Sequence, residues 1–248
     1  ASTATPALWQ HEGREYVLAA THGGGDHRQG KMRLIDPKDG KVLWTVEKLG
    51  NTHFALAPSE NHVLVNVTSK TQGWGEVPWM LLGCYRLSLQ GAALAWTMPD
   101  ELEVWHEARY EASDWRKYLI RDGKVYYYSR SRNPDRTDVG AFFVFDEETG
   151  KILYRQRGRG EADVPMPGQH YLIEDRLLQI PDASHGTRVT LRLWTADPND
   201  LRPLGAPWPS PHPGTTAYNV FMEFPYVDGR IFMRAQDGTV RCYDLRRP

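Results

Sequence analysis

A segment that recurs along the chain constrains the fold more than any other feature of the sequence. Each copy is a run of strand-forming residues. In two copies the strand ends at Asp, passes a turn with Gly and re-enters a strand that closes on an aromatic residue. The copies lie at 31–44, 84–96, 142–154 and 240–245, with a weaker one at 191–204. A repeat on this length scale indicates a solenoid, a propeller or an array.

The spacing of the copies fits a propeller blade. The copies share one hydrophobic position, which is occupied by Leu34, Leu87, Val144, Leu193 and Cys242. Successive members of this set are 53, 57, 49 and 49 residues apart, close to the roughly 40–50 residues of a four-stranded blade. We therefore predict an all-β fold, a β-propeller of about five recognisable four-stranded antiparallel blades.

Polar turns mark the hairpin before each copy. The turn pairs are Glu12-Gly13, Glu60-Asn61, Asp122-Gly123, Glu174-Asp175 and Asp228-Gly229. Such pairs favour the positive-φ turns of tight hairpins, and the aromatic residue that ends the last strand can pack between neighbouring blades. We expect one domain over residues 1–248, with blade cores near 31–46, 84–98, 142–156, 191–204 and 231–245.

Composition excludes several classes of function. The chain has 248 residues, a net charge of −1 and mixed charges, so we expect no nucleic-acid partner. No apolar run approaches the roughly 18 residues of a membrane span, and residues 1–10 look like a strand within a blade rather than a signal peptide. Cys84 and Cys242 lie in repeat cores three periods apart, so we expect two free, buried thiols.

The pattern Asp-x-x-x-Gly-Lys-x-x-Trp at Asp36–Trp44, with its variant at Asp146–Tyr154, resembles the blade motif of the quinoprotein-like (PQQ-like) β-propeller repeat family. Residues 225–245 resemble the last blade of bacterial PQQ-binding-like propeller proteins. Such propellers usually have seven or eight blades, so the resemblance implies part of a larger ring; a closed five-bladed ring is the alternative. It also implies a periplasmic or secreted protein.

The resemblance does not extend to the quinone cofactor. Catalytic members of the family carry adjacent cysteines and a calcium-binding acidic cluster around the quinone. Here Cys84 and Cys242 are 158 residues apart, and the sequence has no matching acidic cluster. We therefore expect no bound PQQ.

Two loops carry residues that suit a divalent metal. The glycine-rich segment 21–30 contains His22, Asp26 and His27, and a second turn contains His185. Imidazole and carboxylate groups are common metal ligands, and these four residues would form a site if the fold brought them together. The alternative is a pair of solvated hairpin tips. Neighbours in one loop rarely supply the geometry of a nucleophile and its base.

Aromatic residues in the long connections suggest a recognition surface. The candidates are Trp74, Trp79, Trp105, Tyr110, Trp115, Trp208 and His212. Exposed aromatic side chains on propeller loops would suit a glycan, a peptide or a protein. The alternative is that they cap the core between blades, and that the proline-rich segment 207–218 is a stiff connection.

The leading hypothesis is a non-catalytic binding or scaffold propeller that presents its loops and channel mouth to a protein or carbohydrate partner. One alternative is a metal- or quinone-dependent enzyme, or a fragment of one, that uses the loop histidines and aspartates. Another is a partial propeller that another chain completes through an open blade edge.

Overall fold

The computed structural model describes residues 6–21, 29–50, 57–74, 77–99, 118–132, 138–158, 168–181, 190–206, 208–209, 225–234 and 239–246. These residues form five antiparallel sheets, in each of which neighbouring strands follow one another in sequence. The all-β propeller prediction is confirmed. The last sheet has three strands in the described residues, whereas the others have four.

The sheets follow the predicted repeat. The first contains β1 (Ala7–His11), β2 (Arg14–Thr21), β3 (Gly30–Ile35) and β4 (Val42–Leu49). The second contains β5 (Ala57–Pro58), β6 (His62–Trp74), β7 (Val77–Leu87) and β8 (Ala92–Thr97). The third contains β9 (Tyr118–Arg121), β10 (Lys124–Arg132), β11 (Asp138–Asp146) and β12 (Ile152–Gly158).

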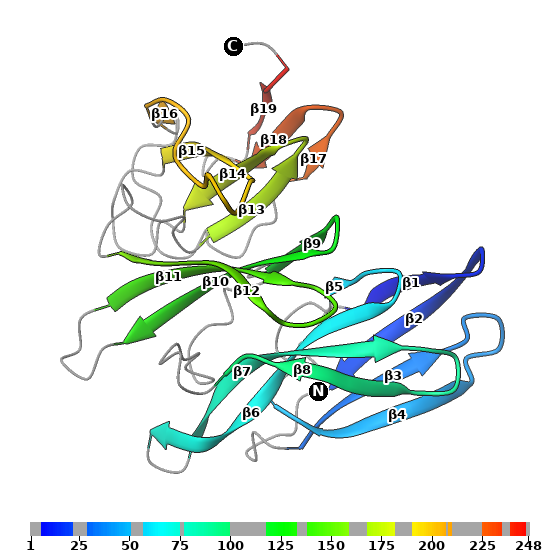
Figure 1. Cartoon of the computed structure of the whole chain (residues 1–248). Helices are drawn as coiled ribbons and strands as arrows, with labels where there is room; N and C mark the ends of the chain where they lie inside the picture. Colours follow the sequence, from blue (N-terminus) through cyan, green and yellow to red (C-terminus); the bar gives the residue numbers. More distant parts are fainter. Residues whose placement is uncertain are drawn as a thin grey trace.

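The last two sheets complete the series. The fourth contains β13 (Gly168–Ile173), β14 (Arg176–Pro181), β15 (Thr190–Thr195) and β16 (Trp208–Pro209), and the fifth contains β17 (Tyr226–Val227), β18 (Arg230–Arg234) and β19 (Val240–Asp244). Figure 1 shows consecutive sheets beside one another, with the first and fifth sheets at opposite ends of the series.

The tight hairpins use the predicted turn chemistry at most positions. Both residues have positive φ at Glu12-Gly13, Asp122-Gly123 and Asp228-Gly229. At Glu174-Asp175 only Glu174 does, with φ of 54°. Glu60-Asn61 differs because neither residue has positive φ. There the Ser59 Oγ accepts a hydrogen bond from the backbone N–H of His62 and so stabilises the turn.

Every sheet carries an apolar residue pair on its forward face, which is turned toward the next sheet in sequence. The strand register gives these forward pairs as Leu18/Leu34, Leu64/Cys84, Tyr126/Val144, Leu178/Leu193 and Phe232/Cys242. The neighbouring register positions form backward pairs on the opposite face: Val17/Ile35, Val63/Tyr85, Val125/Phe145, Leu177/Trp194 and Ile231/Tyr243. The alternation follows from the two-residue period of a strand.

Forward and backward pairs of successive sheets form the core. Tyr126 and Val144 share a buried cluster with Leu177 and Trp194. Leu178 shares the next cluster with Ile231, and Leu193 and Tyr243 pack against it. The first three sheets share the largest cluster. The core therefore lies between the sheets, as burial of both faces of each internal sheet requires.

Both cysteines are free, as predicted, but only Cys84 is buried. The prediction of two buried thiols was wrong for Cys242, which is exposed. Cys242 belongs to the forward pair of the fifth sheet, and no described sheet covers that pair. Its position in a repeat core therefore does not bury it.

Candidate functional site

The two ends of the sheets differ in what connects the strands. At one end, here called the turn end, tight turns join β1 to β2, β3 to β4 and their equivalents in the other sheets. At the opposite, loop end, β2, β6, β10, β14 and β18 finish and the connections between sheets begin.

Three of the candidate residues from the sequence lie in described strands near the loop end. Trp74 pairs with Val77 in the hairpin between β6 and β7, and Trp79 lies in β7. Trp208 lies in β16 opposite Leu191. The remaining candidates lie outside the described residues: His22, Asp26, His27, Trp105, Tyr110, Trp115, His185 and His212. The metal site and the aromatic surface therefore stay predictions.

Tryptophans fasten the turn end of each of the first two sheets to the next. Trp44 donates from its indole Nε1 to the Ser88 carbonyl at 2.9 Å. Trp96 donates to the Glu147 carbonyl at 2.8 Å. The predicted packing of the strand-ending aromatic between blades is confirmed for these two residues. An indole N–H needs a partner when it is buried, and the turn carbonyl supplies one.

The third aromatic of the series behaves differently. The Tyr154 hydroxyl donates to Gln156 in its own strand, and its ring packs against the cluster between the third and fourth sheets. The tie to the fourth sheet comes from Tyr126, whose hydroxyl donates to the Ala196 carbonyl at 2.9 Å. Burial raises the pKa of the Tyr126 hydroxyl to about 12, so the group stays a hydrogen-bond donor at neutral pH.

A buried polar cluster lies between the second and third sheets. His62 is 2% exposed, and its Nδ1 lies 3.1 Å from Glu147 Oε1. Its Nε2 lies 3.4 Å from Glu148 Oε2 without hydrogen-bond geometry. Ser59 Oγ donates to the same Glu147 oxygen, and Arg86 donates to Glu148. The cluster thus joins the turn after β5 to the turn after β11.

The order of groups in this cluster indicates a structural role. In a nucleophilic triad the imidazole stands between the hydroxyl and the carboxylate, so that it can take the hydroxyl proton. Here the Glu147 carboxylate stands between Ser59 and His62. The nearby thiol of Cys84 is also unsuited to attack, because burial and then the Glu147 charge raise its pKa to about 12.

Sequence reasoning missed His62, although a signal was available. The strand register makes His62 equivalent to Lys124, Arg176 and Arg230, each opposite the end of the third strand of its sheet. A histidine at a position that holds Lys or Arg in three other sheets indicates that its surroundings differ from theirs. The register was needed to see this, since it aligns the strands across turns of different length.

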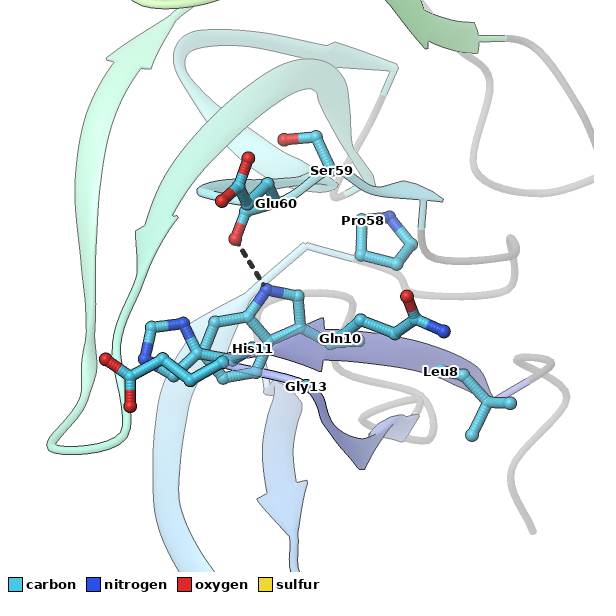
Figure 2. A pocket seen from close by; sticks show the side chains of 9 residues that line it. Leu8, Gln10, His11, Gly13, Pro58, Ser59 and Glu60 are labelled. Carbon is cyan, nitrogen blue, oxygen red and sulfur yellow. Dashed lines mark hydrogen bonds between the residues drawn. The ribbon is translucent and has the colours of Figure 1, made fainter.

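A pocket of about 530 Å³ opens at the turn end between the first and second sheets. Figure 2 shows the turn after β1 below it and the segment Pro58–Glu60 above it, joined by the 2.8 Å hydrogen bond from Trp9 Nε1 to the Glu60 carbonyl. The His11 ring stacks on Trp9 with ring centroids 4.8 Å apart. None of these lining residues was a candidate, because nothing in their sequence pattern suggests a ligand.

The described residues contain no group of three or more His, Cys, Asp or Glu side chains placed to hold a metal ion. In the same part of the chain, no helix is long and apolar enough to cross a membrane. A metal site built from His22, Asp26, His27 and His185 involves other residues and remains open to experiment.

No protein-family model and no curated protein matches the chain. Solved structures do. BamB from Moraxella catarrhalis is 14% identical, with a TM-score of 0.53 over 98% of this chain and 61% of its own. A europium-containing methanol dehydrogenase is also 14% identical, with a TM-score of 0.52 over 85% of this chain and 45% of its own.

A third structure, KlAtg21 in complex with the coiled-coil of AgAtg16, is 10% identical, with a TM-score of 0.55 over 97% of this chain and 66% of its own. At these identities the likeness shows a shared β-propeller fold. The chain spans about three fifths of the length of BamB and under half of the dehydrogenase. Membership of the PQQ-like repeat family stays a prediction.

Proposed function

We propose that the chain is a non-catalytic β-propeller module that binds a protein partner through its loop end. The observation that carries the proposal is the contrast between the two ends. At the turn end, short turns are held to neighbouring sheets by Trp9, Trp44 and Trp96. At the loop end the long, non-repeating connections leave the sheets, and the candidates Trp74, Trp79 and Trp208 lie in strands near it. Binding residues are typically carried by loops on a rigid scaffold.

A protein partner is favoured over a carbohydrate. A neighbour in fold, KlAtg21, was solved with a coiled-coil partner, which shows that a propeller of this shape can present a surface to a protein. The Trp and Tyr residues of the loop-end connections are of the type enriched in protein interfaces. The expected location outside the bacterial cytoplasm rests on the resemblance of the blade motif alone.

Paired variants test this proposal. Trp74 and Trp79 are changed to Ala together at the loop end, and the exposed Gln90 and Asn199 are changed to Ala together at the turn end as the control. Each protein is immobilised at equal density, and capture from an extract of the source cells is quantified. Circular dichroism first confirms that both variants are folded.

The proposal expects the loop-end variant to lose about tenfold or more of the captured protein, as loss of an aromatic hot spot would, while the turn-end variant matches the original chain. Loss of capture in the turn-end variant alone would overturn it. If capture survives protease treatment of the extract and is lost after glycan removal, the partner is a carbohydrate and the protein-partner proposal is wrong.

A further inference from the structure

Among the residues that the structure describes, two apolar sheet faces have no sheet packed against them, one at each end of the series of sheets. Four internal contacts join the forward pair of one sheet to the backward pair of the next. Two pairs are then left over: Val17/Ile35 on the first sheet and Phe232/Cys242 on the fifth. Figure 1 shows these two sheets at opposite ends of the series.

The leftover pairs have the residue types of the covered ones. Among the equivalents of Val17, the residues Val63, Val125 and Leu177 are 0% exposed and Ile231 is 1% exposed. Val17 itself is half-buried. This position is apolar in all five sheets and buried in four of them. The same position in the first sheet is therefore suited to packing against a partner.

The backward face of the first sheet is apolar well beyond this pair. The register places Leu8 beside Val17, Val17 beside Ile35 and Ile35 beside Val42, so one apolar row crosses all four strands. Leu8 is 59% exposed and Val42 is 45% exposed. A continuous apolar row on the surface indicates an interaction site, whereas scattered apolar residues do not.

The forward face of the fifth sheet matches it. Phe232 is half-buried and Cys242 is exposed. Val227 and Val240 share this face by strand alternation and are 59% and 67% exposed. These four residues form the second uncovered apolar face.

The two faces are complementary in direction and in charge. One is a forward face and the other a backward face, which is the combination at every internal contact. Between the second and third sheets, Arg86 pairs with Glu148. The register and the matching turns make Asp244 the equivalent of Arg86 and Lys38 the equivalent of Glu148. In the proposed contact Lys38 would approach Asp244, which is already paired with Arg246 and Arg230 of its own sheet, with the charges of the internal pair exchanged.

We infer that the chain associates head to tail with a second copy of itself, the forward face of the fifth sheet packing on the backward face of the first sheet of the copy. The contact continues the interface that already joins the five sheets. It is heterologous, so it either closes into a ring or extends into a longer assembly.

Two double variants, each changing only exposed residues, test the inference. Leu8→Glu with Val42→Glu charges the backward face, and Val227→Glu with Val240→Glu charges the forward face. Sedimentation velocity on the unchanged chain should show an assembly at micromolar concentration. Each variant alone should sediment as a monomer. An equimolar mixture of the two should form a one-to-one dimer, because each variant keeps one intact face.

A second measurement reads the interface directly. Cys242 is the exposed thiol of the forward face, and Cys84 is buried. At a total concentration about ten times the dissociation constant, roughly a quarter of the forward faces stay free, so alkylation of Cys242 should be about fourfold slower than in the backward-face variant. A monomer at all concentrations, or unchanged assembly in both variants, would overturn the inference. In the first of these cases the faces could still accept blades from a different polypeptide.

Discussion

Two turns with the same backbone hydrogen bonds differ in what lies against them. The turns Asp36–Lys41 and Asp146–Lys151 both bond the Asp N–H to the Lys carbonyl and the Gly N–H to the Asp carbonyl. Gly40 and Gly150 have φ of 73° and 68°. A Cβ on Gly150 would lie 2.6 Å from the Trp96 ring, whereas a Cβ on Gly40 would meet nothing within 4 Å. The repeat therefore specifies the turn, and the neighbouring sheet decides whether it becomes a contact.

The largest expected effect comes from removing the Trp96 ring, which packs against the turn Asp146–Lys151. Trp96→Ala should lower the free energy of unfolding by about 3–5 kcal/mol, because it leaves a cavity and removes the indole donor to the Glu147 carbonyl. Urea denaturation followed by circular dichroism measures this. Trp96→Phe keeps most of the packing and should cost clearly less. A loss below about 1 kcal/mol for Trp96→Ala would show that the contact between the sheets is not tight.

Substitution of the two glycines should separate the cost of backbone strain from the cost of steric overlap with the neighbouring sheet. Gly40→Ala should cost about 1–2 kcal/mol, the price of a left-handed conformation in a residue with a Cβ. Gly150→Ala adds overlap with the Trp96 ring and should cost roughly 1–3 kcal/mol more. Both are measured by urea denaturation. Equal costs would contradict the different surroundings of the two turns.

Substitutions in the polar cluster of His62, Glu147 and Glu148 should have a smaller effect on stability. His62→Ala should cost about 1–3 kcal/mol, because Glu147 loses a partner in a largely buried site. Thermal unfolding measures the change. Glu148→Gln is the matched control: its side chain is 60% exposed, so it should cost less than about 1 kcal/mol. A larger cost for Glu148→Gln than for His62→Ala would show that the exposed Arg86–Glu148 pair, and not His62 with Glu147, joins the two sheets.

The smallest effect is a dependence on alkaline pH. Burial, and then the Glu147 charge, raise the pKa of the Cys84 thiol from 9.0 to about 12. The thiolate is therefore disfavoured in the folded state, and the contribution of Cys84 to stability is complete below pH 9 and lost as the pH rises toward 12. Cys84→Val should remove this part of the pH dependence. An unchanged profile in the variant would contradict the burial of the thiol.

The sequence predicted the fold because the repeat carries it. The turn from Asp36 to Lys41 and its equivalent at Asp146 are local signals, and strand alternation sets which residues face each sheet. The docking of Trp44 and Trp96 followed from the same pattern. The fifth sheet departs from it because only three of its strands lie in the described residues.

The site was harder to predict for a physical reason. The loop-end connections do not repeat, so no internal comparison decides whether a residue such as His22 is a metal ligand or a solvated side chain. His62 was overlooked because its role depends on Glu147, which lies 85 residues away in sequence. The exposure of Cys242 likewise depends on what lies beyond the fifth sheet, and a repeat position carries no information about that.

Site-specific photo-crosslinking tests the central claim most directly. A benzophenone amino acid is placed at position 74, 79 or 208 at the loop end, or at position 90 or 199 at the turn end, and each protein is irradiated with the captured partner. The account predicts crosslinks from the loop-end positions and none from the turn-end positions. Crosslinks from the turn end alone would contradict it and make the pocket beside Trp9 and Glu60 the binding site.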